Sequence, residues 1–154
     1  MKEIMNRKAV YEQLKIDEGV EYVIYEDHLG YPTFGIGHLI VKGDEELGKP
    51  IGTPVSVERV KECFENDLDM AIGECNALFE DKDTFSNLPG EVQQILVNMM
   101  FNMGRTRLSK FKNFIAAIEA KDWKTAAAEG RDSLWYRQVT NRAERLMVRM
   151  ENVK

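Results

Sequence analysis

Residues 18–38, EGVEYVIYEDHLGYPTFGIGH, constrain the fold of this chain more than any other segment. Two acidic residues, Glu18 and Asp27, stand on either side of a short aromatic and β-branched run. A turn follows, and a glycine-spaced stretch then extends from Thr33 to His38. Short apolar runs between turn residues are typical of hairpins. The segment therefore predicts a small antiparallel sheet with two carboxyl groups beside it.

The rest of the chain predicts mainly helices. Ser56 offers a helix N-cap, and the apolar residues after it recur with a helical period. This pattern predicts one long amphipathic helix at about residues 57–79. Strands are expected at residues 22–25, 33–36 and 38–41, a loop at 42–55, and further helices at 7–16, 89–103, 111–120, 123–131 and 141–152. Asp122 and Thr140 are the expected N-caps of the last two helices. The predicted fold class is α+β and mostly helical.

A pair of carboxyl groups on opposite sides of one cleft is what cleavage of a glycosidic bond requires. One group protonates the leaving oxygen, and the other handles water or stabilises the sugar cation. Glu18 stands at the C-terminal end of a predicted helix, where the helix dipole disfavours a negative charge, so a chemical role explains it more easily. Asp27 is equally well explained as a turn-capping acid. Thr33 is a strand residue whose hydroxyl is otherwise expected to face solvent.

The spacing of these residues is itself a motif. Eight residues separate Glu18 from Asp27, five separate Asp27 from Thr33, and Gly-Ile-Gly-His follows at residues 35–38. Further segments along the chain are Asn66-Asp67-Leu68-Asp69, Asn98-Met99-Met100-Phe101-Asn102-Met103-Gly104, Trp123, Trp135-Tyr136 and Thr140-Asn141-Arg142-Ala143. In this order the chain resembles the phage-type lysozymes, the endolysins of glycoside hydrolase family 24. The resemblance covers nearly the whole chain, with a shortened stretch between His38 and Val57.

The resemblance implies a bilobal lysozyme-like fold, in which a long helix joins a small β-sheet lobe to a larger helical lobe. Residues 1–154 are then a single lysozyme domain. Its β-rich lobe is expected at about 17–56, its linking helix at about 57–79, and its helical lobe at about 80–154 together with the N-terminal helix.

The resemblance also implies the reaction, which is hydrolysis of the β-1,4 bond between N-acetylmuramic acid and N-acetylglucosamine in bacterial peptidoglycan, without a metal or an organic cofactor. Glu18 is then the general acid, and partial burial is expected to raise its pKa. Asp27 with Thr33 handles the attacking water, and the family's phage branch inverts the anomeric carbon. Two alternatives stay open: a lytic transglycosylase acting on the same bond, and a non-catalytic wall-binding phage module.

Further site residues follow from the same resemblance. Leu39 and Phe101 match positions that touch sugar rings, and ordinary packing explains each of them equally well. Phe114 and Glu129 align with two other substrate positions, where relatives carry a small hydroxyl and an amide.

Three supporting residues are also implied. Arg142 matches a cation near the catalytic glutamate, and it is expected to pull the pKa of Glu18 down. His38 is expected to pair with Asp67 of the long helix. The alternatives are a surface arginine at a helix start and an unpaired surface histidine.

The net charge of −5 conceals a segregation along the chain. Residues 63–91 carry eight acids and one lysine, whereas residues 92–154 carry twelve bases and six acids. The basic region suits an anionic polymer such as peptidoglycan, although an ordinary solvated surface explains it as well. Cys63 and Cys75 stand about 18 Å apart on one predicted helix, too far for a disulfide, so we expect free thiols in a reducing compartment.

Residues 1–8 show no apolar core of a secretory signal, and no stretch approaches the ~18 apolar residues of a membrane span. We therefore expect a monomer that accumulates in the host cytoplasm. Its expected partner is the glycan strand of peptidoglycan rather than nucleic acid or a membrane. A membrane-permeabilising pore protein would have to give it access to the wall.

Overall fold

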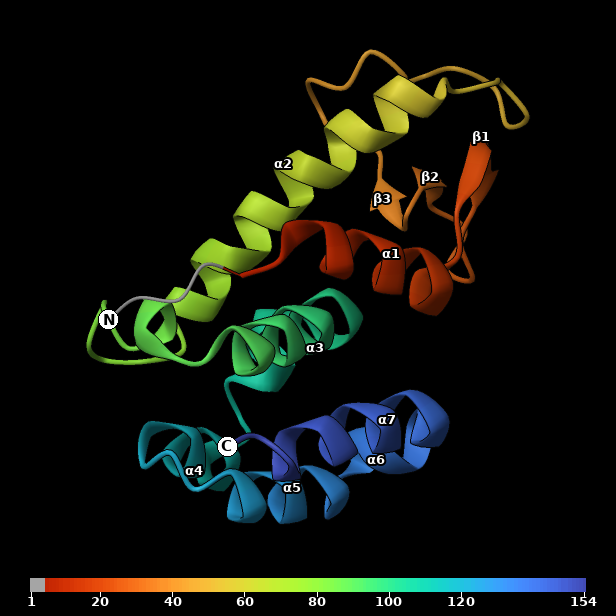
Figure 1. The fold of residues 1–154 in the computed structure, drawn as a ribbon. Coiled ribbons are helices and arrows are strands. Elements are labelled where there is room, and N and C mark those ends of the chain that lie inside the picture. The colour runs from red at the N-terminus through yellow and green to blue at the C-terminus, as the bar shows by residue number, and fades with distance from the viewer. Residues whose placement is uncertain (1–4) are drawn as a thin grey trace. The chain divides into compact units, whose positions relative to one another are not determined.

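The structure is a computed structural model that describes residues 5–154. Its elements are α1 (Arg7–Glu18), β1 (Glu21–Glu26), β2 (Pro32–Gly35), β3 (His38–Leu39), α2 (Val57–Asn76), the 3-10 helix η1 (Phe85–Asn87), α3 (Gly90–Leu108), α4 (Lys112–Glu119), α5 (Trp123–Arg131), α6 (Leu134–Gln138) and α7 (Thr140–Glu151). The described chain is mostly helical with a small sheet near its N-terminus, which confirms the predicted α+β class (Figure 1). The expectation about an export signal concerns residues 1–8, of which 1–4 lie outside the described residues.

The described residues form two compact units. The first, hereafter the sheet unit, is Lys8–Met70; the second, hereafter the helical unit, combines residues 5–7 with Ala71–Lys154. The boundary falls inside α2. The family resemblance implies that the N-terminal helix belongs with the helical lobe, whereas nearly all of α1 belongs to the sheet unit. The packing of Tyr11 explains this, because its ring lies edge-on to that of Phe64 on α2, with centroids 5.1 Å apart.

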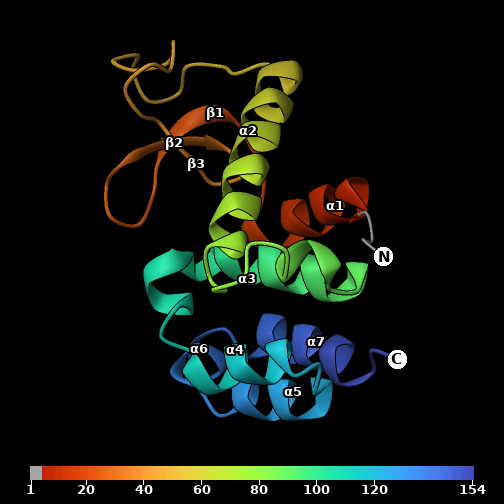
Figure 2. The ribbon, with the colours of Figure 1, turned by 90° about the vertical axis from the view of Figure 1, so that its left-hand side faces the viewer.

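The sheet is antiparallel, with the strand order β1-β2-β3 (Figure 2). Successive side chains of a strand point to opposite faces. Ile24 and Phe34 point to the inner face, where both are completely buried. Gly35 allows α2 to approach the end of β2, because its φ is +64° and a Cβ there would lie 3.1 Å from Cγ1 of Val60.

Two of the predicted helix caps are confirmed. The Ser56 hydroxyl and the Asp122 carboxylate each accept a hydrogen bond, at 3.1 Å, from the backbone N–H three residues later. The prediction for Thr140 is wrong, because Thr140 is the first residue of α7 and its hydroxyl donates to the carbonyl oxygen of Tyr136 at 2.8 Å.

The long helix and the short ones also differ from expectation. α2 ends at Asn76 and not at residue 79. Neither η1 nor α6 was predicted, because three and five residues are too few to show a helical period. Cys63 and Cys75 on α2 are buried free thiols, as predicted, and burial raises the pKa of Cys63 to about 11.

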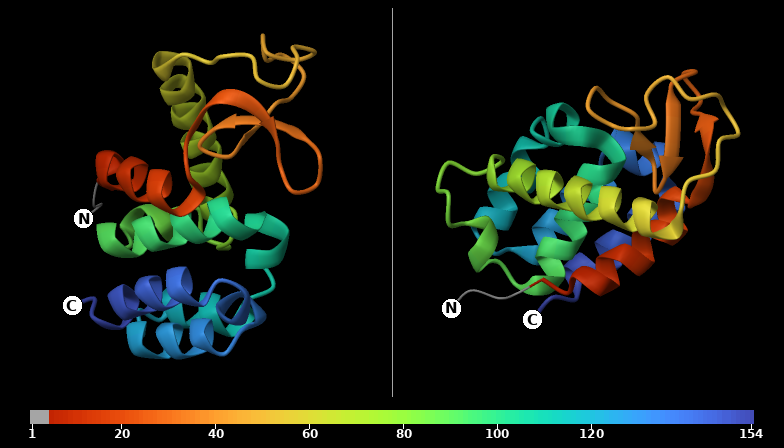
Figure 3. Two further views of the ribbon diagram at one scale, coloured as in Figure 1. Left: turned by 90° about the vertical axis from the view of Figure 1, so that its right-hand side faces the viewer. Right: turned by 90° about the horizontal axis from the view of Figure 1, so that it is seen from above.

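The helical unit is built around α3, which is buried on nearly all sides, as its apolar composition predicts. Gly104, at φ +78°, interrupts α3 before its last turn. α5 and α7 lie side by side (Figure 3). Arg131 of α5 joins them through ion pairs with Glu144 and Glu151, each at 2.8 Å.

Candidate active site

Glu18 is the last residue of α1, and the chain turns directly after it at Gly19, where φ is +76°. Its side chain is partly buried and lies against the turn between β2 and β3. A Cβ at Gly37 of this turn would stand 3.5 Å from Oε1 of Glu18. The structure thus places the predicted acid beside the glycine-spaced end of the sheet.

Asp27 closes the hairpin between β1 and β2. Its Oδ1 accepts hydrogen bonds from the backbone N–H groups of Leu29 and Tyr31, both at 2.9 Å. Asp27 therefore caps the turn, as the simpler explanation held. Both bonds end on Oδ1, so Oδ2 remains outside the turn and keeps its capacity to accept a proton or a hydrogen bond.

Thr33 lies in β2 opposite Tyr25 and is 4% exposed. The simpler alternative, a hydroxyl that faces solvent, does not hold, because Oγ1 donates to the carbonyl oxygen of Tyr31 at 3.0 Å. With its hydrogen engaged there, Oγ1 has only acceptor capacity left for a further partner. The predicted role in holding water stays a prediction.

Tyr25 is a neighbour of these groups that the spacing motif does not include. Burial raises its pKa, and the negative charges of Glu21, Asp27 and Glu18 raise it further. The phenol therefore stays protonated, and it lies within electrostatic range of both predicted catalytic carboxylates. In the sequence, Tyr25 is one of several aromatic residues in the hairpin. Its position opposite Thr33 depends on the strand register, which the sequence does not indicate.

His38 bridges two carboxylates. Its Nδ1 lies 2.7 Å from Oδ2 of Asp67 on α2, which is the expected pair, and its Nε2 lies 2.8 Å from Oδ2 of Asp44. The second contact was not expected from the sequence. Burial opposes protonation of the ring, but the hydrogen bonds to Asp67 and Asp44 outweigh it, so the pKa of His38 is raised.

Asp44 continues this network to Arg59 of α2, whose Nη2 lies 3.4 Å from Oδ1 of Asp44. Arg59 also donates to both carboxylate oxygens of Glu46, at 2.9 and 3.0 Å. These bonds lower the pKa of Glu46, a side chain that is itself buried. The network ties the loop after β3 to α2 at two points.

In the helical unit, Arg142 stands in the first turn of α7 and is held by Asn98 of α3. Its Nε donates to Oδ1 of Asn98 at 2.8 Å, and its Nη2 donates to the backbone oxygen of Asn98 at 3.2 Å. Phe101, the predicted sugar contact, follows on the same helix and is partly buried. Arg142 is therefore an oriented cation rather than a loose surface arginine.

Phe114 and Glu129 line one recess of the helical unit, with a volume of about 200 Å³. Lys110, Lys112 and Asp132 add charges of both signs to its lining. The two positions that the resemblance linked to substrate contacts therefore come together. Phe114 is buried and contributes a wall, while Glu129 brings a negative charge.

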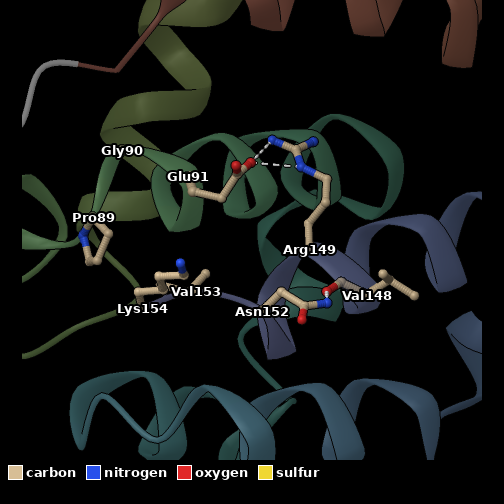
Figure 4. Close-up of a pocket in the computed structure, with 8 residues that line it drawn as sticks. All are labelled: Pro89, Gly90, Glu91, Val148, Arg149, Asn152, Val153 and Lys154. Carbon is tan, nitrogen blue, oxygen red and sulfur yellow. Dashed lines mark hydrogen bonds and ion pairs between the residues drawn. The ribbon is translucent and has the colours of Figure 1, made fainter.

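A second recess of the helical unit, of about 540 Å³, lies between the start of α3 and the end of α7 (Figure 4). Its lining includes Glu91 and Arg149, which form an ion pair, and none of the residues that the sequence singled out. Within residues 5–154, no three His, Cys, Asp or Glu side chains gather to hold a metal ion. No helix in this part of the chain is long and apolar enough to cross a membrane.

The sequence matches a known protein family over most of its length. A family model described as phage lysozyme matches residues 15–151. The chain belongs to the phage lysozyme family. This confirms the resemblance inferred from the residues between Glu18 and His38, and it classes the chain with the lysozyme-type glycoside hydrolases.

Proteins similar to this chain differ widely in length. The chain is 35% identical to the pre-baseplate central spike protein Gp5 of Enterobacteria phage T4, over 90% of this chain and 27% of that protein. It is 34% identical to the probable T4-type lysozyme 2 of Dictyostelium discoideum, over 90% of this chain and 91% of that protein. It is 31% identical to the peptidoglycan hydrolase gp36 of Pseudomonas phage phiKMV, over 82% of this chain and 13% of that protein. The chain therefore spans most of the lysozyme and a small part of the two phage proteins.

Proposed function

We propose that the chain is a muramidase that hydrolyses the β-1,4 bond between N-acetylmuramic acid and N-acetylglucosamine in peptidoglycan. Glu18 is the general acid, and Asp27 with Thr33 handles the water. The observation that carries this proposal is the arrangement in the sheet unit: Glu18 lies against the β2–β3 turn, and Asp27 and Thr33 belong to one hairpin. Family membership and the relative named as a peptidoglycan hydrolase support the wall as substrate.

Asp27 and Thr33 are suited to hold one water molecule between them. Oγ1 of Thr33 is left as an acceptor because its hydrogen bonds to Tyr31, and Oδ2 of Asp27 is left outside the turn. A water that donates one hydrogen to each oxygen directs its lone pair away from both, toward the anomeric carbon. Asp27 takes the proton as the water attacks, and Glu18 gives its proton to the leaving oxygen. Attack on the side opposite the leaving group inverts the anomeric centre.

The first experiment removes the acid. Glu18→Gln keeps the shape of the side chain and removes its transferable proton, which is worth roughly 10²–10⁴-fold in rate. We expect the release of reducing ends from purified peptidoglycan to fall by about this factor, with the melting temperature unchanged. Glu12→Gln is the matched control, an exposed glutamate of the same helix, and should keep full activity. A fully active Glu18→Gln enzyme overturns the assignment.

The products separate hydrolysis from transglycosylation. A hydrolase adds water to the cleaved bond, whereas a transglycosylase leaves a 1,6-anhydro end on the muramic acid. Mass spectrometry of digested glycan strands should therefore show products without anhydro ends. If every product carried an anhydro end, the reaction would be transglycosylation, and the proposed hydrolysis would be wrong.

We also propose that the enzyme acts as a monomer that accumulates in the host cytoplasm and reaches the wall once a pore protein has permeabilised the membrane. The substrate lies beyond the inner membrane, so expression of this chain alone should leave culture turbidity unchanged until chloroform is added. Lysis before chloroform contradicts the proposed route.

A further inference from the structure

The sheet face that carries the predicted catalytic residues continues past them. Cross-strand partners lie on the same face of a sheet, and so do residues two apart on one strand. The pairing of the strands defines a first row made of Tyr25, Thr33 and Leu39. Two further hydrogen bonds, from Asp27 N to Tyr31 O at 2.9 Å and from Ile40 N to Pro32 O at 3.0 Å, extend both ladders toward the turn. The second row is therefore made of Asp27, Tyr31 and Val41.

Two members of the second row are large, apolar and exposed. Tyr31 is 55% exposed and Val41 is 50% exposed. Continuing the two ladders places Tyr31 opposite Val41 at a position without ladder hydrogen bonds, where Cα atoms are about 4.5 Å apart. Burial in the core does not explain this pair, because about half of each side chain is exposed.

The backbone on both sides of this pair is held firmly. Tyr31 donates its N–H to Oδ1 of Asp27, and its carbonyl oxygen accepts bonds from Asp27 N and from Oγ1 of Thr33. Val41 donates its N–H to Oδ2 of Asp44 at 3.0 Å, and its carbonyl oxygen accepts from Asp44 N at 3.0 Å. A binding surface that is rigid before the ligand arrives loses little entropy on binding.

We infer that Tyr31 and Val41 form a binding platform for the sugar unit next to the one that lies at Asp27 and Thr33. This inference rests on the proposed function. A polymeric substrate cleaved beside Asp27 and Thr33 has to continue along their neighbours. Tyr31 lies two strand residues from Thr33, about 6.7 Å, which is comparable with one sugar ring. Neither side chain is charged, and the apolar C–H face of a pyranose ring suits a tyrosine ring flanked by methyl groups. Two side chains offer far less area than the roughly 800 Å² per partner of a stable protein interface, which disfavours a second copy as the occupant.

The test compares four variants on uncross-linked glycan strands prepared from peptidoglycan. Tyr31→Ala should raise KM about tenfold, the effect of losing roughly 1.4 kcal/mol of apolar contact, while kcat stays within about twofold. Tyr31→Phe keeps the ring and should resemble the wild type. Val41→Ala should raise KM to a smaller extent. Val57→Ala is the matched control, because Val57 is a valine with 55% exposure on α2. This helix contacts the opposite face of the sheet, where its Asp67 bonds to His38, the cross-strand partner of Phe34.

Each outcome bears on one proposal. An unchanged KM for Tyr31→Ala, or an equal rise for Val57→Ala, overturns the platform. A wild-type chain that cleaves no glycan overturns the proposed function alone, and co-sedimentation with insoluble peptidoglycan then tests the platform, since Tyr31→Ala should bind about tenfold more weakly. Sedimentation equilibrium tests whether a second copy of the chain occupies this face instead. A wild-type dimer that Tyr31→Ala converts to a monomer would show that it does, and would overturn the inference.

Discussion

At Asp27 the two oxygens of one carboxylate have different surroundings. Oδ1 accepts two backbone hydrogen bonds that shape the turn, whereas neither of these bonds involves Oδ2. Thr33 is divided in the same way, because its hydrogen serves the backbone at Tyr31 and its oxygen remains an acceptor. A structural role and a chemical role are therefore compatible in both residues, and substitutions can separate them.

Asp27→Asn should separate the two roles of this residue. The amide oxygen can keep both turn hydrogen bonds, while the negative charge that accepts a proton from water is lost. We expect activity on purified peptidoglycan to fall roughly 10²-fold or more, with a melting temperature within a few degrees of the wild type. Asp27→Ala, which also loses the turn bonds, should cost an additional ~1–2 kcal/mol of stability in urea unfolding. An Asn variant that fails to fold would show that the turn is the main role of Asp27.

In the sheet unit, ionic contacts hold the loop after β3. His38 is faced by Asp67 from α2 and by Asp44 from the loop, and Arg59 of α2 reaches both Asp44 and Glu46. Although burial opposes it, the hydrogen bonds from Val41 and His38 lower the pKa of Asp44. The loop is thus held by groups whose charges change within an accessible pH range.

The pH dependence of stability follows from the directions of these shifts. The folded pKa of His38 is raised, so its contribution is complete below about 6.5, the unfolded value, and disappears as the pH rises through the folded value. The folded pKa of Asp44 is lowered, so its contribution is present above about 3.9 and is lost as the pH falls. Urea unfolding of His38→Gln should therefore show a stability loss near pH 5.5 that shrinks toward pH 8.5, whereas His28→Gln in the exposed hairpin turn should show none. A loss that grows with pH would contradict this account.

The close packing of α5 against α7 depends on a glycine, Gly130. A Cβ on Gly130 of α5 would lie 2.3 Å from Sδ of Met147, a completely buried side chain of α7. Gly130→Ala should therefore destabilise the chain by about 1–3 kcal/mol, even after Met147 adjusts its rotamer. Gly73→Ala on α2 is the opposite case, because beyond its chain neighbours and the adjacent helix backbone no atom lies within 4 Å of a Cβ there, and it should stabilise by about 0.5–1 kcal/mol. Thermal unfolding measures the change in stability of both variants. If both were destabilised, or both stabilised, the packing argument would be contradicted.

Elements were predictable where the signal is local. Ser56 and Asp122 cap their helices through bonds to residues three positions away, so spacing alone identified them. Asp44 was not identified as a partner of His38, because a loop rich in acids and glycine does not indicate which carboxylate folds back. The place of Tyr25 required the strand register. The spacing of Glu18, Asp27 and Thr33 predicts their roles, which stay predictions. The hydrogen bond that the Thr33 hydroxyl donates depends on the position of the Tyr31 backbone.

At the scale of the whole molecule, charge is distributed unevenly along the chain. Residues 92–154 are strongly basic although the net charge is −5. Screening lengths fall from about 30 Å at 0.01 M salt to about 10 Å at 0.1 M. If the basic region attracts the anionic wall, co-sedimentation with peptidoglycan should weaken several-fold over this range. Replacing the exposed Lys121 and Lys124 by Gln should reduce the salt dependence, and binding that strengthens with salt would contradict the attraction.

The loop after β3 is anchored on both sides of its tip. Before the tip stand the ionic contacts of Asp44 and Glu46, and after it Gly52 N donates to Ile24 O at 2.7 Å and Val55 N donates to Tyr22 O at 2.8 Å. The residues between the anchors, 47–51, are all exposed. A foreign peptide inserted after Gly48 would break the turn hydrogen bond from Lys49 N to Glu46 O, but it would keep the side-chain contacts of Asp44 and Glu46 and the bonds to the sheet. The tip is therefore a position where an affinity peptide or a second wall-recognition module can be grafted without rebuilding the enzyme.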